Sequence, residues 1–263
     1  MPYRMRVLQP YDARYLRDLV LVLTQKEIKV RYKNSWLGYA WSIANPLAFA
    51  LVYLVTFKTF MRIDIPHYSL FLITGLFPWQ WLSNSIGMAP GIFLGNATLL
   101  KKVRFPRNLL VASTVLNDGI HFVISIPVIA GFMLAYGFFP SWSWLIGIPL
   151  LAVPQFLMAY GLALAIASLN LFFRDLERLT TLLLAFLFFL TPIFYSESMM
   201  PSRYRALLYI NPAAPLILSW RRLFLSGSID WPAMAIVYLY ATLALALGVL
   251  IYLKLSWKFA EAV

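Results

Sequence analysis

Residues 232–253 read PAMAIVYLYATLALALGVLIYL and contain no charged side chain. A helix rises 1.5 Å per residue, so roughly 20 apolar residues cross the hydrocarbon core of a bilayer. The apolar run is continuous and does not alternate, unlike the strand of a membrane barrel. Because only helices and closed barrels satisfy their backbone groups in lipid, this stretch predicts a membrane-spanning α-helix.

Five more apolar runs precede this one, and together they predict an all-α membrane protein with six transmembrane helices. Of the 263 residues, 62% are hydrophobic and only 12% are charged, which is too few charges to cover a soluble domain. Glycines at positions 87, 91 and 95 recur on one face of the second run and would permit close packing against another helix. We expect the spans at residues 36–60, 69–94, 108–138, 145–169, 179–195 and 232–253.

The basic residues predict the orientation of these spans. The formal net charge of +12 would suit nucleic-acid binding, but the Lys and Arg residues lie in short segments between the apolar runs. With the N-terminus inside, sixteen of the 22 Lys and Arg residues fall on the cytoplasmic side and six fall outside. This bias is the one that the positive-inside rule describes, so we expect both termini in the cytoplasm and no nucleic-acid partner.

Two connecting segments are predicted to form helices of their own. Residues 14–33 carry apolar side chains on one helical face and basic ones elsewhere, which predicts an amphipathic helix at the membrane surface. A basic flank that only orients the first span is the alternative. Residues 196–231 predict two short amphipathic helices at the outer interface, or an ordinary loop with local helix. The second of these helices has an apolar face made of Leu216, Ile217, Trp220, Leu223 and Phe224.

The sequence contains no motif of an enzyme that we can identify. It has no cysteine, two histidines, no P-loop, no HExxH zinc motif and no GxSxG nucleophile elbow, so we expect no catalytic residue, metal or bound cofactor. Asp118 and His121 lie three positions apart in the third run and share a helical face. Such a pair is typical of a proton relay. We favour a structural role, in which Asp118 pairs with a neighbouring helix.

Short motifs, in a fixed order along nearly the whole chain, carry a resemblance to a known family. They resemble the permease subunit of ABC transporters that export polysaccharides, above all O-antigen exporter permeases, with teichoic-acid and capsule exporters as relatives. The motifs are Trp36-Leu37-Gly38 with Trp41 and Pro46, Gly75-Leu76-Phe77-Pro78-Trp79 with Trp81, Lys102-Val103-Arg104-Phe105-Pro106, Leu169-Asn170-Leu171-Phe172-Phe173-Arg174-Asp175, Thr191-Pro192-Ile193 with Tyr195, and Tyr209-Ile210-Asn211-Pro212.

The resemblance implies a permease of the bacterial cytoplasmic (inner) membrane that moves an undecaprenyl-linked polysaccharide. Such permeases pair with a second copy of themselves and with two copies of a separate ATP-binding subunit. ATP and Mg²⁺ would then be bound by that subunit, and this chain is not expected to be an enzyme. A permease for small molecules or drugs could share the topology. A membrane enzyme acting on lipid-linked sugars is a further alternative, but the acidic residues are scattered over different loops.

The resemblance also implies roles for individual segments. Residues 1–35 would form a basic helix on membrane lipids, residues 36–253 the transmembrane domain and residues 254–263 a cytoplasmic tail. Within the domain, residues 97–107 would form a coupling helix that docks on the ATPase, and residues 197–231 would form re-entrant gate helices outside.

Specific side chains follow from the same resemblance. An alternative applies to the tryptophans and tyrosines among them, because most such residues at span ends are interface anchors. The coupling residues would be Leu100, Lys101, Lys102, Val103, Arg104, Phe105, Pro106 and Arg107, the substrate entrance would contain Lys26, Lys29, Arg31 and Lys33, and candidates for the sugar path are Trp36, Tyr39, Trp41, Phe186, Phe189 and Tyr195.

Overall fold

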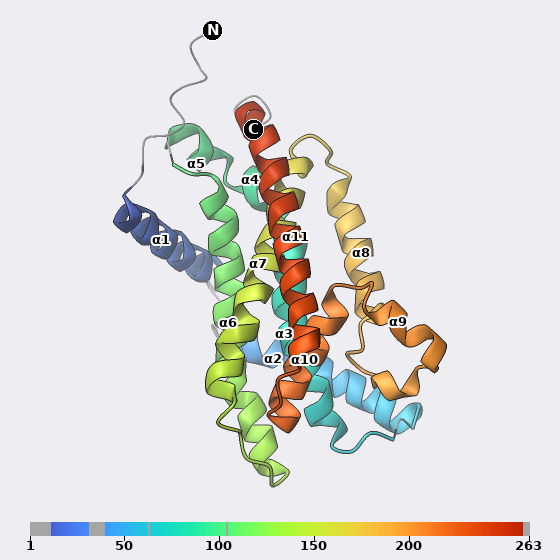
Figure 1. Ribbon diagram of the computed structural model, residues 1–263. Coiled ribbons are helices and arrows are strands. Elements are labelled where there is room, and N and C mark those ends of the chain that lie inside the picture. Colours follow the sequence, from blue (N-terminus) through green and yellow to red (C-terminus); the bar gives the residue numbers. More distant parts are fainter. Residues whose placement is uncertain (1–11, 32–39, 63, 104, 260–263) are drawn as a thin grey trace.

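The computed structural model describes residues 12–31, 40–62, 64–103 and 105–259, and in this part of the chain every regular element is a helix (Figure 1). The predicted all-α class is therefore confirmed. Among the described residues, four stretches are long and apolar enough to cross a membrane. They are Ile43–Phe60, Asn108–Ala135, Trp144–Asn170 and Trp231–Lys258.

The elements follow one another in the order in which they are numbered in Figure 1, with η denoting a π or 3-10 helix. They are α1 (Ala13–Arg31), α2 (Trp41–Tyr53), the π-helix η2 (Leu54–Phe60), α3 (Tyr68–Met88), α4 (Gly91–Gly95), α5 (Ala97–Lys102), α6 (Asn108–Ala135), α7 (Trp144–Asn170), α8 (Leu176–Leu190), η3 (Glu197–Met199), η4 (Ser202–Tyr204), α9 (Arg205–Leu208), α10 (Ala213–Ser226), α11 (Trp231–Leu255) and η5 (Ser256–Lys258).

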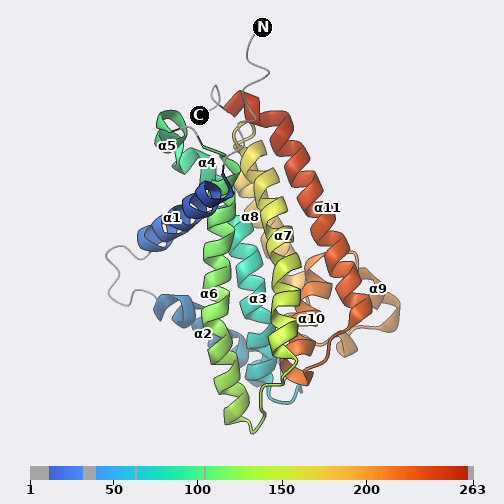
Figure 2. The same cartoon turned by 60° about the vertical axis from the view of Figure 1, so that its left-hand side comes forward.

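Helix α3 lies in the middle of the bundle, in contact with α2, α6, α7, α8 and α10 (Figures 1 and 2). Two of its polar side chains find partners on α6, as buried polar groups in an apolar medium must. The indole Nε1 of Trp81 donates to the carbonyl of Val115 at 3.1 Å, and the hydroxyl of Ser85 donates to Asp118 Oδ2 at 2.9 Å. The central helix is therefore held by hydrogen bonds as well as by apolar packing.

The closest helix pair is α7 with α11, which pack along most of their length. At their crossing, Gly161 faces the backbone of Ala244, and Gly248 faces the carbonyl of Gly161. A methyl group at Gly248 would lie 2.8 Å from the carbonyl carbon of Gly161, which is closer than real side chains approach. Small residues at this crossing let the two backbones touch, which is how helices commonly associate in lipid.

The close packing that Gly87, Gly91 and Gly95 would permit is not made among the described residues. A methyl group at Gly91 or Gly95 would meet no other described atom within 4 Å, and one at Gly87 would make only an ordinary contact with Leu184. The physical reason is a break in the helix. Helix α3 ends at Met88 and α4 begins at Gly91, so the regular spacing does not lie along one continuous helix.

Prolines inside the helices leave backbone carbonyls that need other donors. Pro154 in α7 has no N–H, so the carbonyl of Leu150, four residues earlier, loses its helical partner. The hydroxyl of Tyr238 on α11 donates to this carbonyl at 3.0 Å. The proline thus creates a second polar link between α7 and α11.

Several spans end at residues other than the predicted ones. The fifth run was expected to extend to residue 195, but α8 ends at Leu190, and Thr191 takes an extended conformation. A residue before proline disfavours the helical conformation, so Pro192 terminates this helix. The helix predicted at residues 14–33 is confirmed as α1, and the third, fourth and sixth runs correspond to α6, α7 and α11.

The α2–η2 segment lies obliquely across the bundle in both views, whereas α6, α7 and α11 run along it (Figures 1 and 2). No residue of η2 is buried, and α8 buries only Thr180, so both elements present apolar side chains outward. The exposed residues include Phe49, Leu51, Val52, Val55, Phe60, Leu179, Leu182, Leu183, Phe186, Phe189 and Leu190.

The connecting segments gather at two opposite ends of the bundle (Figure 2). At one end, Arg107 after α5 contacts Ser256 after α11, and the α7–α8 turn contacts the same region. At the other end, His67 before α3 contacts Tyr136 in the α6–α7 connection. These contacts join connecting segments that the sequence assigned to the same side of the membrane.

Candidate functional site

Helix α10 is enclosed by the bundle and carries a buried arginine. It packs against α3, α7 and α11, and its side chains are buried on almost every face. The sequence analysis expected an amphipathic helix at the outer interface. The structure instead places this segment inside the protein, with Arg221 only 6% exposed. A charged group so deep in an apolar bundle is costly unless it is hydrogen-bonded, so its partners define the site.

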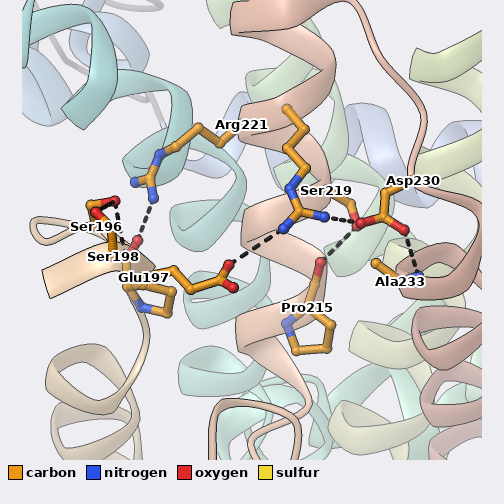
Figure 3. A network of polar contacts seen from close by, with 10 residues as sticks. Ser196, Glu197, Ser198, Pro215, Ser219, Arg221, Asp230 and Ala233 are labelled. Carbon is orange, nitrogen blue, oxygen red and sulfur yellow. Dashed lines mark hydrogen bonds and ion pairs between the residues drawn. The ribbon is translucent and has the colours of Figure 1, made fainter. Parts of the chain in front are cut away.

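The guanidinium of Arg221 binds backbone carbonyls from two other segments. Figure 3 shows the guanidinium and one of these contacts. Its Nη1 donates to Pro192 at 2.6 Å and its Nη2 donates to Ile193 at 2.7 Å. Its Nε donates to the carbonyl of Phe71 on α3 at 3.3 Å, and the guanidinium carbon lies 3.7 Å from the centre of the Phe71 ring. One side chain on α10 thereby joins α3 to the turn that follows α8.

The glycine of the Gly75-Leu76-Phe77-Pro78-Trp79 motif makes room for this arginine. A methyl group at Gly75 would lie 2.5 Å from Nη2 of Arg221, too close for any real contact. The guanidinium cannot easily move aside, because three carbonyls hold it. Glycine at this position is therefore explained by the close approach of a buried cation.

Two further motifs meet beside Arg221. The side-chain amide of Asn211 donates to Thr191 Oγ1 at 2.9 Å, and Asn211 Oδ1 accepts from the backbone N–H of Ala213 at the start of α10 at 3.0 Å. The hydroxyl of Tyr68 donates to the carbonyl of Phe194 at 2.9 Å. The motifs at residues 75–79, 191–193 and 209–212 are far apart in the sequence, yet they build one junction, which we call the α10 junction.

The next residue on α10 faces a different set of partners. Arg222 is about one third exposed and forms ion pairs with Glu197 of η3 and with Asp230, which begins α11 (Figure 3). Asp230 also accepts from the backbone N–H of Ala233 at 3.1 Å and so caps α11. Because these charges are partly solvated, each pair adds at most about 1 kcal/mol, and they orient η3 more than they stabilise it.

A buried amide links α10 to the centre of the bundle. Gln155 on α7 donates to the carbonyl of Pro78 on α3 at 2.9 Å and accepts from the indole N–H of Trp220 on α10. Gln155 and Trp220 are both fully buried. With Arg221, these contacts fix α10 to α3 and α7 by polar groups that have no water to replace them. Any movement of α10 must therefore carry its neighbours or break these bonds.

The aromatic residues predicted for the sugar path lie partly in one cluster. Phe189 and Tyr195 both contact Phe194, with ring centres 5.8 Å and 5.3 Å apart. Phe186 and Trp41 are exposed, and Trp36 and Tyr39 lie outside the described residues. The cluster also contains aromatic residues that the sequence reasoning did not select, namely Phe49, Tyr53, Phe57, Trp79, Phe188 and Phe194.

The predicted coupling residues lie at the opposite end of the bundle from η3 and α9 (Figure 1). Lys101 and Lys102 end α5 and point outward, and Val103 is 48% exposed. Phe105 turns inward and is buried. The remaining predicted residues are Leu100 and Pro106, which are half-buried, Arg107, which contacts the end of α11, and Arg104, which lies outside the described residues.

The predicted entrance residues lie on α1, which packs against α6. Lys29 is exposed, Lys33 and the side chain of Arg31 lie outside the described residues, and Lys26 already has polar partners. The ammonium of Lys26 donates to Oδ1 of Asn96, between α4 and α5, and forms an ion pair with Glu27 at 3.5 Å. Lys26 thus ties α1 to the start of α5.

Asp118 and His121 do not lie free in the bundle. Asp118 is 2% exposed and accepts from Ser85 on the neighbouring helix α3, which agrees with the structural role that we favoured. The residue that the sequence reasoning missed is Arg221. The sequence did contain a signal for this residue, because Arg221 and Arg222 interrupt an otherwise apolar helical segment. A charged residue inside an apolar membrane helix is by default a candidate functional residue.

Comparison with known proteins places the chain beside transport proteins. Residues 18–225 match the family described as ABC-2 type transporter. This stretch covers α1 through α10, except for the last residue of α10 and the first residues of α1, and so includes every residue of the α10 junction.

Individual relatives extend the similarity to almost the whole chain. The chain is 45% identical over 257 residues to an O-antigen export system permease protein, RfbA, of Klebsiella pneumoniae, with 98% of this chain and 99% of the relative covered. It is 35% identical to the protein of the same name from Myxococcus xanthus, over 79% of this chain and 80% of that one. It is 24% identical to the polysialic acid transport protein KpsM of Escherichia coli, over 89% and 92%.

Proposed function

Because this chain belongs to the ABC-2 type transporter family, we propose that it is the membrane subunit of an exporter for a lipid-linked polysaccharide of the O-antigen type. The observation that carries the proposal is the 45% identity over 98% of the chain to a permease named for O-antigen export. A capsular polysaccharide is the second candidate, because a polysialic acid transport protein is also similar, at 24% identity. The O-antigen assignment is favoured because the sequence identity to the O-antigen permease, 45%, is nearly twice the 24% identity to the polysialic acid transport protein.

We propose six membrane crossings, through α3, α6, α7, α8 and α11 and, at an oblique angle to them, through α2–η2 (Figures 1 and 2). The apolar character of four stretches supports this number, and α3 and α8 add two more apolar helices of 21 and 15 residues. The end of the bundle that carries α1, α5 and the end of α11 is assigned to the cytoplasm, because most of the basic residues belong to its segments. The protein would then lie in the cytoplasmic membrane of the cell with both termini inside.

A second copy of the chain is proposed to cover the outward faces of α2–η2 and α8. Both elements expose large apolar side chains and bury almost none of their residues, whereas α11 also exposes apolar side chains but buries six residues. In a bilayer such a face can meet lipid or another helix, so the argument for a partner rests on the aromatic cluster. Aromatic rings stack on the apolar faces of sugars, and two facing clusters would line a path between the copies.

ATP hydrolysis is proposed to take place on a separate ATP-binding subunit that docks on α5. The sequence of this chain contains no P-loop, while its relatives are permease proteins of export systems. Helix α5 presents Lys101, Lys102 and Val103 to the outside. Lys29 and the neighbouring basic residues on α1 would meet anionic lipid head groups and the pyrophosphate of the substrate at the same end.

The proposal is tested by deleting the gene in its source strain and complementing it with the chain. We expect the deletion strain to lose surface O-antigen and to accumulate the lipid-linked polymer inside, because synthesis continues without export. The measurement is the lipopolysaccharide ladder on a gel, together with the intracellular lipid-linked polymer. Normal surface O-antigen in the deletion strain, or its restoration by an unrelated permease alone, would contradict the proposal.

Charge reversal on α5 should uncouple export. Replacing Lys101, Lys102 and Arg104 by glutamate is expected to lower export about 10-fold or more. A partner surface that is complementary to these cations would be repelled by the new negative charges. The matched control is Arg203→Glu, an exposed arginine in η4 at the other end of the bundle, which should leave export within about 2-fold of wild type. Unchanged export by the triple variant, with normal assembly of the ATP-binding subunit, would refute the assignment of α5.

A further inference from the structure

The last described residue of the chain is buried against the cytoplasmic end of the bundle. Phe259 is 1% exposed, although it follows the final helix and belongs to a segment that the sequence analysis treated as a tail. Its ring centre lies 5.0 Å from that of Phe93 on α4 and 5.8 Å from that of Tyr252 on α11. It also lies 6.5 Å from the ring of Phe172, in the turn between α7 and α8.

A cation that follows α5 also contacts Phe259. The guanidinium of Arg107 lies 5.8 Å from the centre of the Phe259 ring, within the range of a cation–π interaction. Its Nη1 donates at 3.3 Å to the carbonyl of Ser256, just beyond the end of α11. A cation at a helix C-terminus also interacts favourably with the helix dipole. The residues that follow α5 are therefore attached to the end of α11 by two contacts.

The neighbouring side chains show that the inward direction of Phe259 is specific. Trp257 is 69% exposed, and the ammonium of Lys258 lies over its ring. The short helix η5 thus turns one aromatic side chain outward and the next one inward. Phe259 contacts four segments that are distant in the sequence, namely α4, the residues after α5, the α7–α8 turn and α11. Trp257 is also a large aromatic residue, but unlike Phe259 it is exposed.

We propose that Phe259 is a positioning residue for energy coupling, which braces the α4–α5 segment against α7 and α11. The inference rests on the proposed docking of an ATP-binding subunit on α5. A displacement of α5 reaches the long helices only if the segment is packed against them, because a loosely attached segment would move by itself. Phe259 supplies that packing through Phe93 on α4 and Arg107 after α5, while Lys101 and Lys102 on α5 remain exposed. It lies outside residues 18–225, the part of the chain that matches the family.

The experiment compares Phe259→Ala with Trp257→Ala in the assembled transporter. Each variant is expressed with its ATP-binding subunit in the deletion strain; surface O-antigen is measured in cells and ATP hydrolysis on the purified complex. For Phe259→Ala we expect the subunit to co-purify and ATP hydrolysis to stay within about 2-fold, while export per ATP falls about 5- to 30-fold. For Trp257→Ala we expect export per ATP within about 2-fold of wild type. Phe259→Leu, which keeps most of the buried volume, should restore export in part.

Other results overturn the proposal. Equal export per ATP in Phe259→Ala and Trp257→Ala would show that the brace has no role in coupling. If Phe259→Ala does not accumulate in the membrane, Phe259→Leu and Arg107→Met are compared with wild type instead. Lowered export per ATP in these variants supports the proposed role of Phe259. Export that falls only in proportion to the amount of protein refutes it. If no ATP-binding subunit co-purifies with the wild-type chain, the proposed function itself fails, and this outcome is seen before any variant is compared.

Discussion

Replacement of Arg221 by methionine is expected to lower the thermal stability of the purified protein by about 10 °C and export by at least about 10-fold. The substitution keeps an unbranched stem but leaves the carbonyls of Pro192 and Ile193 without this donor, while the carbonyl of Phe71 still accepts from the hydroxyl of Thr74. Each buried carbonyl left unpaired costs about 1–3 kcal/mol, and 1 kcal/mol corresponds to roughly 2–4 °C in a chain of this size. The measurement is the midpoint of thermal aggregation by size-exclusion chromatography of heated samples.

Two variants show whether hydrogen-bond geometry or charge is responsible for this effect. Arg221→Lys keeps the charge but cannot donate two parallel bonds to Pro192 and Ile193, so we expect it to recover less than half of the loss. Arg203→Met removes an exposed arginine from the same connection and should change the midpoint by no more than about 2 °C. A stable and active Arg221→Met protein would mean that the α10 junction is held by apolar packing alone.

Replacement of Gly248 by alanine should also prevent normal assembly of the bundle. Alanine is usually favoured over glycine inside a helix by about 0.5–1 kcal/mol, so the substitution would be harmless if only helix propensity mattered. Here the added methyl group would overlap the backbone of Gly161, which cannot rotate away. Overpacking of this kind costs about 1–3 kcal/mol or more. We therefore expect α7 and α11 to separate, the protein to aggregate and export to be lost.

The control for this prediction is Gly131→Ala on α6. A methyl group there would meet no other described atom within 4 Å, so only helix propensity should act and the thermal midpoint should stay the same or rise slightly. Gly161→Ala on the facing helix should reproduce the loss, because its methyl group would overlap the backbone of Ala244. If Gly248→Ala and Gly131→Ala behave alike, the close approach of α7 and α11 is not required for the fold.

The α10 junction gives a physical account of motifs that the sequence could only describe. Gly75 makes room for a buried cation, Pro192 ends α8 and offers its carbonyl to that cation, and Asn211 joins Thr191 to the start of α10. Each residue is unremarkable by itself. Together they fix the turn after α8 to α3 and α10, so the aromatic cluster beside this turn is held on a rigid support.

Long apolar runs and the distribution of basic residues predicted the helical class, the positions of α6, α7 and α11 and the grouping of connections at two ends. These features follow from the free-energy cost of exposing backbone polar groups and charges to lipid. Because each segment bears this cost by itself, its own sequence is enough to predict the outcome. The short motifs predicted the family because each motif is a local stretch of sequence that can be recognised without the tertiary structure. The regular glycine spacing at residues 87–95 misled us, because a break after Met88 interrupts the helix.

What the sequence by itself determined is therefore which segments are helices, which of them suit a membrane and which family they resemble. Only the tertiary structure decided that α10 lies inside the bundle, that Arg221 binds three carbonyls, that Gly161 meets Gly248 and that Phe259 turns inward. The physical reason is that each of these contacts joins residues distant in the sequence. Its energy depends on the distance and direction between two helices, and no single segment contains that information.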